Sequence, residues 1–106
     1  MATVARWTDF QGRPVELSHG GFAHIVTNHP EFSEPIAIIE GALTDPLRLV
    51  RDARISNAEC YYRTIGGRVM VKVVVVFRPT PSGWVSGVLT AHPTVRYGRK
   101  EQQIWP

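Results

Sequence analysis

Two histidines early in the chain and one lysine far downstream are the residues best suited to do chemistry. His24 and His29 lie within residues 21–31, and Lys72 lies within residues 69–77, where every other residue is apolar. Such an apolar run is typical of a central β-strand, in which an unpaired ammonium group would be costly. We therefore expect the Lys72 side chain to reach a carboxylate, a bound anion or the open end of a sheet.

These residue types suit cleavage of a phosphodiester without a metal ion. In that reaction a base removes the proton of the 2′-hydroxyl, a cation stabilises the charge of the phosphorane, and an acid protonates the leaving 5′-oxygen. Tight hairpins at two turns rich in Gly and Pro should place Tyr62, Lys72 and Thr90 on neighbouring strands. Strict alternation in the last strand predicts that Ser86, Thr90 and His92 share one face.

Each candidate also has a purely structural interpretation. His24 and His29 are five residues apart, or about 140° around a helix. They therefore share no helical face and do not match the spacing of a helical zinc pair. His24 could be a half-buried helix residue, and His29 could bond to the last carbonyl groups of the helix. Lys72 could extend to solvent at the start of its strand or pair with Asp52 or Glu59. We predict neither a metal nor a cofactor.

The composition predicts one globular domain of an ordinary kind. The chain has 106 residues, of which 43% are apolar and 20% are charged, as in a typical soluble domain. Its formal net charge of +3 permits a nucleic-acid partner without requiring one. The single cysteine, Cys60, excludes an intrachain disulfide and is expected to be a buried small hydrophobe. Without an apolar leader or a membrane-spanning stretch, the chain is expected to act in a cytoplasm, its own or that of a target cell, and not at a membrane.

The first half of the chain is predicted to hold a short hairpin and two helices. Residues 1–17 contain two strand-like pieces around a turn. Ser18 is a plausible N-cap for a helix that ends before Pro30. Ser33, followed by Pro35, is the predicted N-cap of a second helix, which stops at a Thr-Asp-Pro cluster. The two helices are expected to pack together as a helical hairpin.

The second half is predicted to be an antiparallel meander, whose first strand is charged and is expected near an edge of the sheet. Its strands are residues 48–52, 59–65, 69–77 and 84–92, with turns at 66–67 and 79–83. The predicted fold class is therefore α+β, with an N-terminal helical hairpin packed on an antiparallel sheet of about four strands. The chain is predicted to form a single domain with a core at 18–92, an N-terminal hairpin at 1–17 and a basic tail at 93–106. In the tail, Trp105 is expected to pack on the core.

Five short segments occur in a fixed order along the chain. They are His24-Ile25 with His29-Pro30-Glu31, an Ile-rich helix ending at Asp45-Pro46, Tyr61-Tyr62, Lys72-Val73-Val74-Val75 and Val88-Leu89-Thr90-Ala91. Together they resemble the phage-associated nucleases of the barnase–EndoU–colicin–RelE (BECR-fold) superfamily. The resemblance spans residues 22–92 and implies metal-independent ribonuclease activity on a fold of helices and a four-stranded antiparallel sheet. It also implies a toxin or phage-delivered effector that is accompanied by an antitoxin or immunity protein.

The resemblance assigns the catalytic site to His24, His29, Tyr62, Lys72 and Thr90. We predict an endoribonuclease that cleaves RNA, with tRNA as one candidate substrate, by 2′-hydroxyl attack to leave a cyclic phosphate. A histidine would act as base or acid, Lys72 would hold the phosphate, and the tyrosine and threonine would position it. Contacts with the RNA backbone are expected from Arg51, Arg63, His92 and Arg96. Two other classes stay open, namely a non-catalytic module that binds RNA or a protein, and a structural protein–protein domain.

Overall fold

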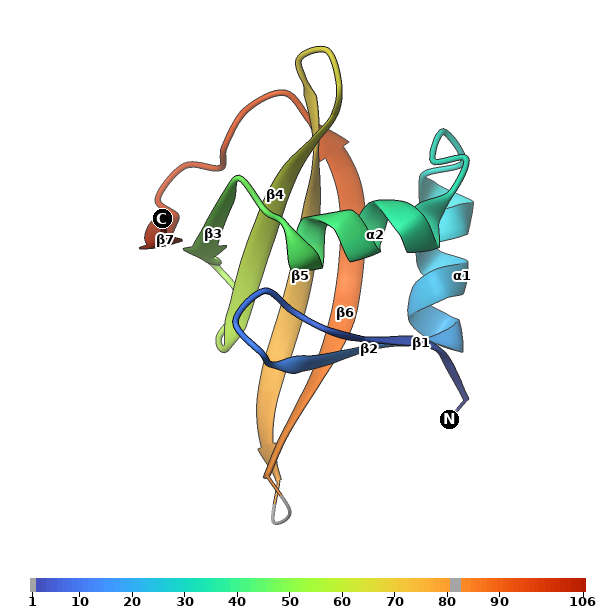
Figure 1. Cartoon of the computed structure of the whole chain (residues 1–106), viewed down its shortest axis with the longest axis vertical. Coiled ribbons are helices and arrows are strands. Elements are labelled where there is room, and N and C mark those ends of the chain that lie inside the picture. The colour runs from blue at the N-terminus through green and yellow to red at the C-terminus, as the bar shows by residue number, and fades with distance from the viewer. Residues whose placement is uncertain (1, 81–82) are drawn as a thin grey trace.

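The computed structural model describes residues 2–80 and 83–106, and the side chains of these residues except 79–80 and 83–85. Within the described part, the chain forms a first pair of strands, then two helices, and then five further strands (Figure 1). The helices are α1 (His19–Asn28) and α2 (Pro35–Thr44). The strands are β1 (Thr3–Thr8), β2 (Pro14–Ser18), β3 (Arg48–Arg51), β4 (Ala58–Gly66), β5 (Val69–Thr80), β6 (Gly83–Thr94) and β7 (Gln102–Trp105). The predicted turn at 79–83 includes residues 81–82, which lie outside the described part.

All seven described strands form one sheet in the order β1-β2-β6-β5-β4-β3-β7. Neighbouring strands are antiparallel except β2 and β6, which run parallel. The predicted architecture is therefore wrong, although the broad α+β class is right. The sheet is mixed and has seven strands instead of about four, and the helices follow a hairpin that itself belongs to the sheet. The pairing of β2 with β6 joins residues far apart in the sequence, so the pattern of each strand alone could not reveal it.

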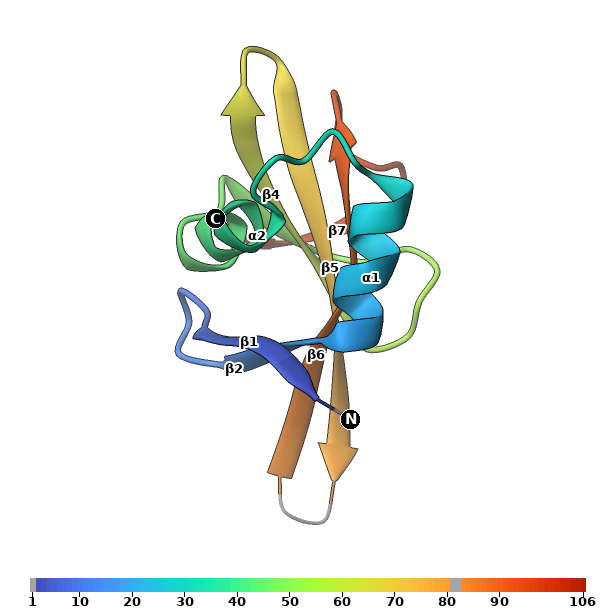
Figure 2. The same cartoon turned by 90° about the vertical axis from the view of Figure 1, so that its right-hand side faces the viewer.

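The two helices pack on the sheet separately, which corrects the predicted helical hairpin. α2 packs on β4 and β5, whereas α1 packs on β6 and β2, and their axes are steeply inclined to each other in Figures 1 and 2. α1 begins as predicted, because the Ser18 hydroxyl accepts a hydrogen bond from the Gly21 N–H at 3.1 Å. A Cβ atom at Gly21 would lie 3.2 Å from the Val88 carbonyl oxygen, so this glycine lets α1 approach β6 closely. α2 begins one residue later than predicted, after Glu34, with Pro35 in its first turn.

The two faces of the sheet are covered by different parts of the chain. We call the side under α1 and α2 the helix face, and its buried side chains include Tyr61 and Val73. We call the other side the C-terminal face, and its buried side chains include Tyr62 and Val74. Residues 95–101, which we call the crossing segment, connect the end of β6 to β7 at the far edge of the sheet (Figure 1). The crossing segment therefore covers part of the C-terminal face.

A β-bulge in β6 decides which of its side chains reach the C-terminal face. The ladder between β5 and β6 passes over Leu89, which is an extra residue in β6. Thr90 and His92 therefore lie on the C-terminal face, whereas Ser86, before the bulge, lies on the helix face. The Ser86 hydroxyl donates a hydrogen bond to the carbonyl oxygen of Pro14 in β2. The predicted common face of Ser86, Thr90 and His92 is wrong, because strict alternation does not hold across a bulge.

The last residues of the chain complete the sheet. β7 pairs with β3 and forms the edge, so β3 lies near an edge of the sheet, as its charged residues predict, with β7 beyond it. Trp105 packs against the core as predicted, with its ring centroid 4.7 Å from that of Phe10. Neither described helix is long and apolar enough to cross a membrane.

Candidate active site

A row of polar side chains crosses the C-terminal face where β6, β5 and β4 lie side by side. Lys72 is the direct strand partner of both Tyr62 and His92, so the three side chains point to the same side of the sheet. Thr90 lies on this face two positions before His92 in β6. At the end of α1, the ring centroid of His29 lies 6.1 Å from that of His92. The fold thus brings together four of the five predicted catalytic residues and adds His92.

This row opens into a pocket of about 390 Å³. Tyr62, Lys72 and His92 line it together with residues 94 and 96–99, which bring two exposed guanidinium groups, those of Arg96 and Arg99. A larger pocket of about 540 Å³ lies against the loop between β3 and β4, but it contains none of the predicted catalytic residues. The smaller pocket is therefore the better candidate site, because titratable groups converge there.

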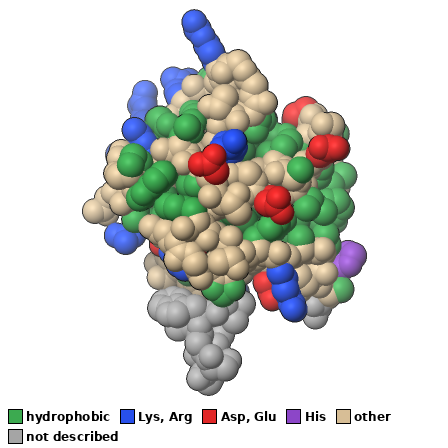
Figure 3. Space-filling model, in the orientation of Figure 1, with side chains coloured by type: hydrophobic (Ala, Val, Ile, Leu, Met, Phe, Trp, Pro, Cys, Tyr) green, Lys and Arg blue, Asp and Glu red, His purple; other side chains and the backbone are tan. Residues whose placement is uncertain are grey.

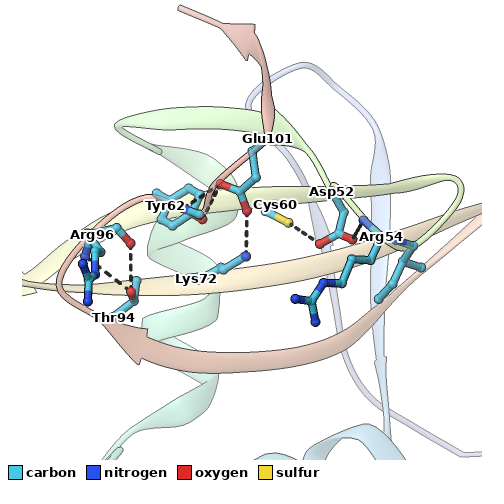
Figure 4. Close-up of polar contacts among 10 residues, drawn as sticks. Asp52, Arg54, Cys60, Tyr62, Lys72, Thr94, Arg96 and Glu101 are labelled. Carbon is cyan, nitrogen blue, oxygen red and sulfur yellow. Dashed lines mark hydrogen bonds and ion pairs between the residues drawn. The ribbon is translucent and has the colours of Figure 1, made fainter.

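Glu101, in the crossing segment, joins two members of the row, Tyr62 and Lys72 (Figure 4). Its Oε2 lies 2.7 Å from Lys72 Nζ, and its Oε1 accepts hydrogen bonds from the Tyr62 hydroxyl at 2.7 Å and from the Gly98 N–H at 3.0 Å. The side chain of Glu101 is 5% exposed and that of Lys72 is 16% exposed. Lys72 thus reaches a carboxylate, as expected, but the partner is Glu101 and not Asp52 or Glu59.

This network fixes the protonation states of Lys72 and Tyr62 at neutral pH. Burial disfavours the ammonium of Lys72, but the hydrogen bond and the charge of Glu101 outweigh it and raise the pKa of Lys72 above its ordinary value. Burial and the hydrogen bond to Glu101 raise the pKa of Tyr62 to about 12. Tyr62 is therefore a neutral hydrogen-bond donor, and Lys72 is a cation.

His92, which lines the pocket, and the neighbouring His29 lie in different surroundings. His92 is half-buried, and burial, together with the charges of Lys72 and His29, lowers the pKa of its imidazole. The backbone N–H of His29 caps α1 by donating to the carbonyl oxygen of Ile25 at 2.8 Å. The Nδ1 atom of His29 lies 3.4 Å from Glu31 Oε1. His92 is thus held neutral, whereas His29 has a carboxylate that can pair with an imidazolium.

Three predicted residues lie away from the pocket. His24 is exposed on α1, where its Nδ1 lies 3.1 Å from the side-chain nitrogen of Asn28. Arg63 lies on the helix face, 2.8 Å from a carboxylate oxygen of Asp45. Arg51 lies in β3, 3.3 Å from the side-chain oxygen of residue 102. Of the predicted RNA-contacting residues, the pocket therefore holds only His92 and Arg96.

Apart from Arg96, the residues of the crossing segment that complete the pocket were not predicted from the sequence. The Tyr97 ring packs edge-on against Tyr62 at 4.8 Å, and the Arg48 guanidinium lies 3.9 Å from the centre of the Tyr97 ring. Neither Tyr97 nor Glu101 could be placed at the pocket from the sequence, because no structure was predicted for the tail. One signal was available: Glu101 is the only acidic residue after Glu59, so it was a natural partner for a lysine in an apolar strand.

One group of side chains has the ligand types of a metal site. Oxygen and sulfur atoms of Asp52, Cys60 and Glu101 lie within 4.8 Å of one another. However, Glu101 already pairs with Lys72, and Asp52 Oδ2 accepts two backbone N–H groups at 2.8 and 2.6 Å. Cys60 is buried as predicted, and burial raises the pKa of its thiol to about 12. These residues therefore do not fit a metal ion, because the Lys72 ammonium already supplies the cation.

Charge is unevenly distributed over the molecule. Residues 14–47 hold five acidic residues and no Lys or Arg, whereas residues 48–106 hold ten basic and three acidic residues. The first range includes both helices, and the second includes every residue that lines the pocket. In Figure 3, Asp and Glu gather mostly over the side of the helices, and Lys and Arg project mainly along the upper and left-hand edges. Arg96 and Arg99 line the pocket on the C-terminal face, whereas Arg63 on the helix face pairs with Asp45, so a polyanion would be attracted to the C-terminal face more than to the helix face.

Comparison with protein-family models, with curated proteins and with solved structures gives no match. The resemblance to BECR-fold nucleases therefore stays a prediction. The side chains of the pocket and the charge around it are the features that bear on function.

Proposed function

We propose that the chain is a metal-independent endoribonuclease whose acid and base are His29 and His92. The observation that carries the proposal is the separation of 6.1 Å between these two rings, beside Lys72 as the strand partner of His92. Two imidazoles and a cation are sufficient for attack on a phosphodiester by its own 2′-hydroxyl. The proposal keeps the predicted positioning roles of Tyr62 and Thr90 and gives His92 a part in the chemistry.

The surroundings of the two rings suit different roles. His92, with its lowered pKa, is neutral near pH 7 and suits the base. His29, with Glu31 beside it, suits the acid. In the proposed step, His92 takes the proton of the 2′-hydroxyl while the bond from the 2′-oxygen to phosphorus forms. The bond from phosphorus to the 5′-oxygen breaks, and His29 gives that oxygen its proton. The products are a 2′,3′-cyclic phosphate and a 5′-hydroxyl.

The cations of the pocket would hold the substrate during this step. Lys72 would stabilise the charge that develops on the phosphorane, and Arg96 would contact a neighbouring phosphate of the RNA backbone. An RNA substrate would place this activity in a cytoplasm. The expected protein partner of such a ribonuclease would be an antitoxin or immunity protein that covers the pocket.

A non-catalytic RNA-binding module is the second candidate function. The uneven charge supports it, because binding of a polyanion needs the cations but not the two imidazoles. This candidate predicts RNA binding that weakens steeply with salt and leaves the strand intact.

Cleavage in the presence of EDTA tests the proposal. Total tRNA and a short single-stranded RNA are incubated with the protein, with His92→Gln and with His24→Gln as a matched control, because His24 is an exposed histidine outside the pocket. We expect cleavage by the wild type and by His24→Gln, and loss of cleavage in His92→Gln. Intact RNA with the wild type, or equal loss in both variants, would contradict the proposal. A gel shift on the same RNA would then test the binding module.

A further inference from the structure

The carboxylate of Glu101 lies among donors that could hold any oxyanion. Lys72 Nζ, the Tyr62 hydroxyl and the Gly98 N–H lie 2.7, 2.7 and 3.0 Å from its two oxygens. A cation, a hydroxyl and a backbone N–H that converge on one point form a usual binding arrangement for phosphate as well as for carboxylate. We call these three donors the cradle.

The cradle is shaped around the group that it holds. A Cβ atom at Gly98 would lie 2.5 Å from Glu101 Oε2 and 2.9 Å from Oε1, so any residue other than glycine at this position would displace the carboxylate. Tyr97 packs on Tyr62 on one side of the carboxylate, and Trp105 packs on Phe10 beyond it. The crossing segment is thus anchored before and after Glu101, while the carboxylate itself is held only by hydrogen bonds and charge.

The pairing with Glu101 also limits what Lys72 can do for a substrate. An ammonium group paired at 2.7 Å with a carboxylate contributes almost no net charge to the pocket. Lys72 can stabilise a phosphate only if the carboxylate moves away. The remaining positive charge of the pocket comes from the exposed groups of Arg96 and Arg99, which could attract a phosphate to this place before any exchange.

We propose that the cradle is an oxyanion site that Glu101 fills as an internal competitor, and that a phosphate group of the RNA displaces it. The identity of the ligand as RNA rests on the proposed function, whereas the oxyanion site itself does not. Glu101 then lowers the affinity for phosphate, and the catalytic pocket has its full charge only after the exchange.

Binding of two probes that cannot be cleaved tests this inference in Glu101→Gln. The probes are inorganic phosphate and a short single-stranded RNA with 2′-O-methyl groups, which lacks the attacking hydroxyl. Glu101→Gln removes the competing charge, so we expect several-fold tighter binding of both probes. For the RNA, the slope of log affinity against log salt should become steeper by about 0.7, the value for one more neutralised phosphate of a single strand. Glu34→Gln is the matched control, because it makes the same change of net charge at an exposed residue before α2. In Glu34→Gln we expect the affinity for inorganic phosphate to stay at the wild-type value.

Two further measurements keep the inference testable if Glu101→Gln is unstable. In Gly98→Ala the added Cβ fills the cradle, so neither carboxylate nor phosphate should bind there and no gain in affinity is expected. In the wild type, titration with phosphate should shift the Gly98 amide resonance saturably. Weaker binding in Glu101→Gln, an equal gain in Gly98→Ala, or a Gly98 amide that does not respond to phosphate would each overturn the inference.

The outcome separates this inference from the proposed function. Tighter binding in Glu101→Gln, with no cleavage of ordinary RNA by any variant, would leave the oxyanion site in place and remove the ribonuclease. Cleavage by the wild type, with weaker binding in Glu101→Gln, would keep the ribonuclease and show that Glu101 positions Lys72 instead of competing for it.

Discussion

Tyr61 and Tyr62 are neighbours in β4 that point to opposite faces of the sheet and hold two networks of similar parts. The Tyr61 hydroxyl donates to Asp9 Oδ2 at 2.6 Å, and Arg13 Nε lies 3.1 Å from the same oxygen. The Tyr62 hydroxyl and the Lys72 ammonium bond to the two oxygens of the Glu101 carboxylate, each at 2.7 Å. Each network therefore ties a carboxylate near one end of the chain to the middle of the sheet through a tyrosine and a cation.

Their surroundings make the Tyr61 network structural and leave the Tyr62 network able to bind an anion. The Asp9 side chain is fully buried and also accepts the backbone N–H groups of Gln11 and Arg13, while Arg13 bonds to Glu59 and lies 4.3 Å from the Phe77 ring centre. Two carboxylates there share one cation, which leaves no positive charge for a ligand. Around Tyr62 a single carboxylate meets Lys72, and further cationic side chains line the same pocket. The comparison shows that the balance of charge, and not the residue types alone, separates the two roles.

The largest expected effect is on stability at the Tyr61 network. Asp9→Ala removes the buried acceptor of the Tyr61 hydroxyl, of Arg13 Nε and of two backbone N–H groups, so we expect the free energy of unfolding to fall by about 3 kcal/mol. Asp45→Ala, which breaks the exposed pair with Arg63, should cost less than about 1 kcal/mol. Urea unfolding of both variants measures the difference. Equal losses would contradict a structural role for the Tyr61 network.

The two tyrosines can be compared directly by removing one oxygen from each. Tyr61→Phe leaves buried Asp9 short of one donor and should lower stability by about 1–2 kcal/mol, without changing phosphate binding. Tyr62→Phe removes one donor of the cradle and should weaken the binding of inorganic phosphate several-fold. Urea unfolding and phosphate titration of the same two proteins provide the measurement. If phosphate binding changed equally in both variants, the distinction between the two networks would fail.

The pH dependence of stability should reveal the protonation of His92, which lies on the C-terminal face with Tyr62. Its pKa in the folded protein is below the ordinary 6.5, so the unfolded chain takes up this proton more readily. Stability should therefore fall as the pH is lowered through 6.5, and His92→Gln should remove this part of the fall. His24→Gln should keep it, since His24 is exposed. Urea unfolding from pH 8 to pH 5 measures the slope, and identical slopes in the two variants would argue against a half-buried neutral His92.

The smallest effect should separate two arginines on opposite faces. Arg96→Gln should weaken RNA binding and lower the salt slope by about 0.7, as expected for the loss of one phosphate contact. Arg63→Gln changes the net charge equally but lies on the helix face beside Asp45, so the slope should stay the same. Titration of 2′-O-methyl RNA at several salt concentrations provides the test. A change of slope in Arg63→Gln would mean that RNA also contacts the helix face.

Much of the local structure could be predicted from the sequence. Hydrophobic alternation and Gly-rich turns located β4, β5 and most of β6, and Ser18 correctly marked the start of α1. The tight turn between β4 and β5 correctly predicted that Tyr62 and Lys72 lie on neighbouring strands, where they are direct partners. These features depend on neighbouring residues, which is why a single sequence reveals them.

The parts that failed depend on contacts between distant residues. The extra residue Leu89 shifts the alternation of β6, but nothing in its side chain marks a bulge. β7 is a short strand with two glutamines, and it has no hydrophobic alternation that would distinguish it from a loop. Without β7 the path of the crossing segment is undefined, so neither Glu101 nor Arg99 could be placed at the pocket. The catalytic candidates were therefore identified more readily than the segment that completes their surroundings.

The uneven charge described above also gives the molecule a permanent electric dipole. Residues 14–47, which include both helices, are acidic, and residues 48–106, which include five strands and the crossing segment, are basic, so these two parts of the molecule carry opposite net charges. In the field of a polyanion, such a dipole turns the protein during diffusion, before any surfaces touch. The C-terminal face would then lead in productive encounters. At low ionic strength, the association rate should exceed that of a protein with the same net charge spread evenly over its surface.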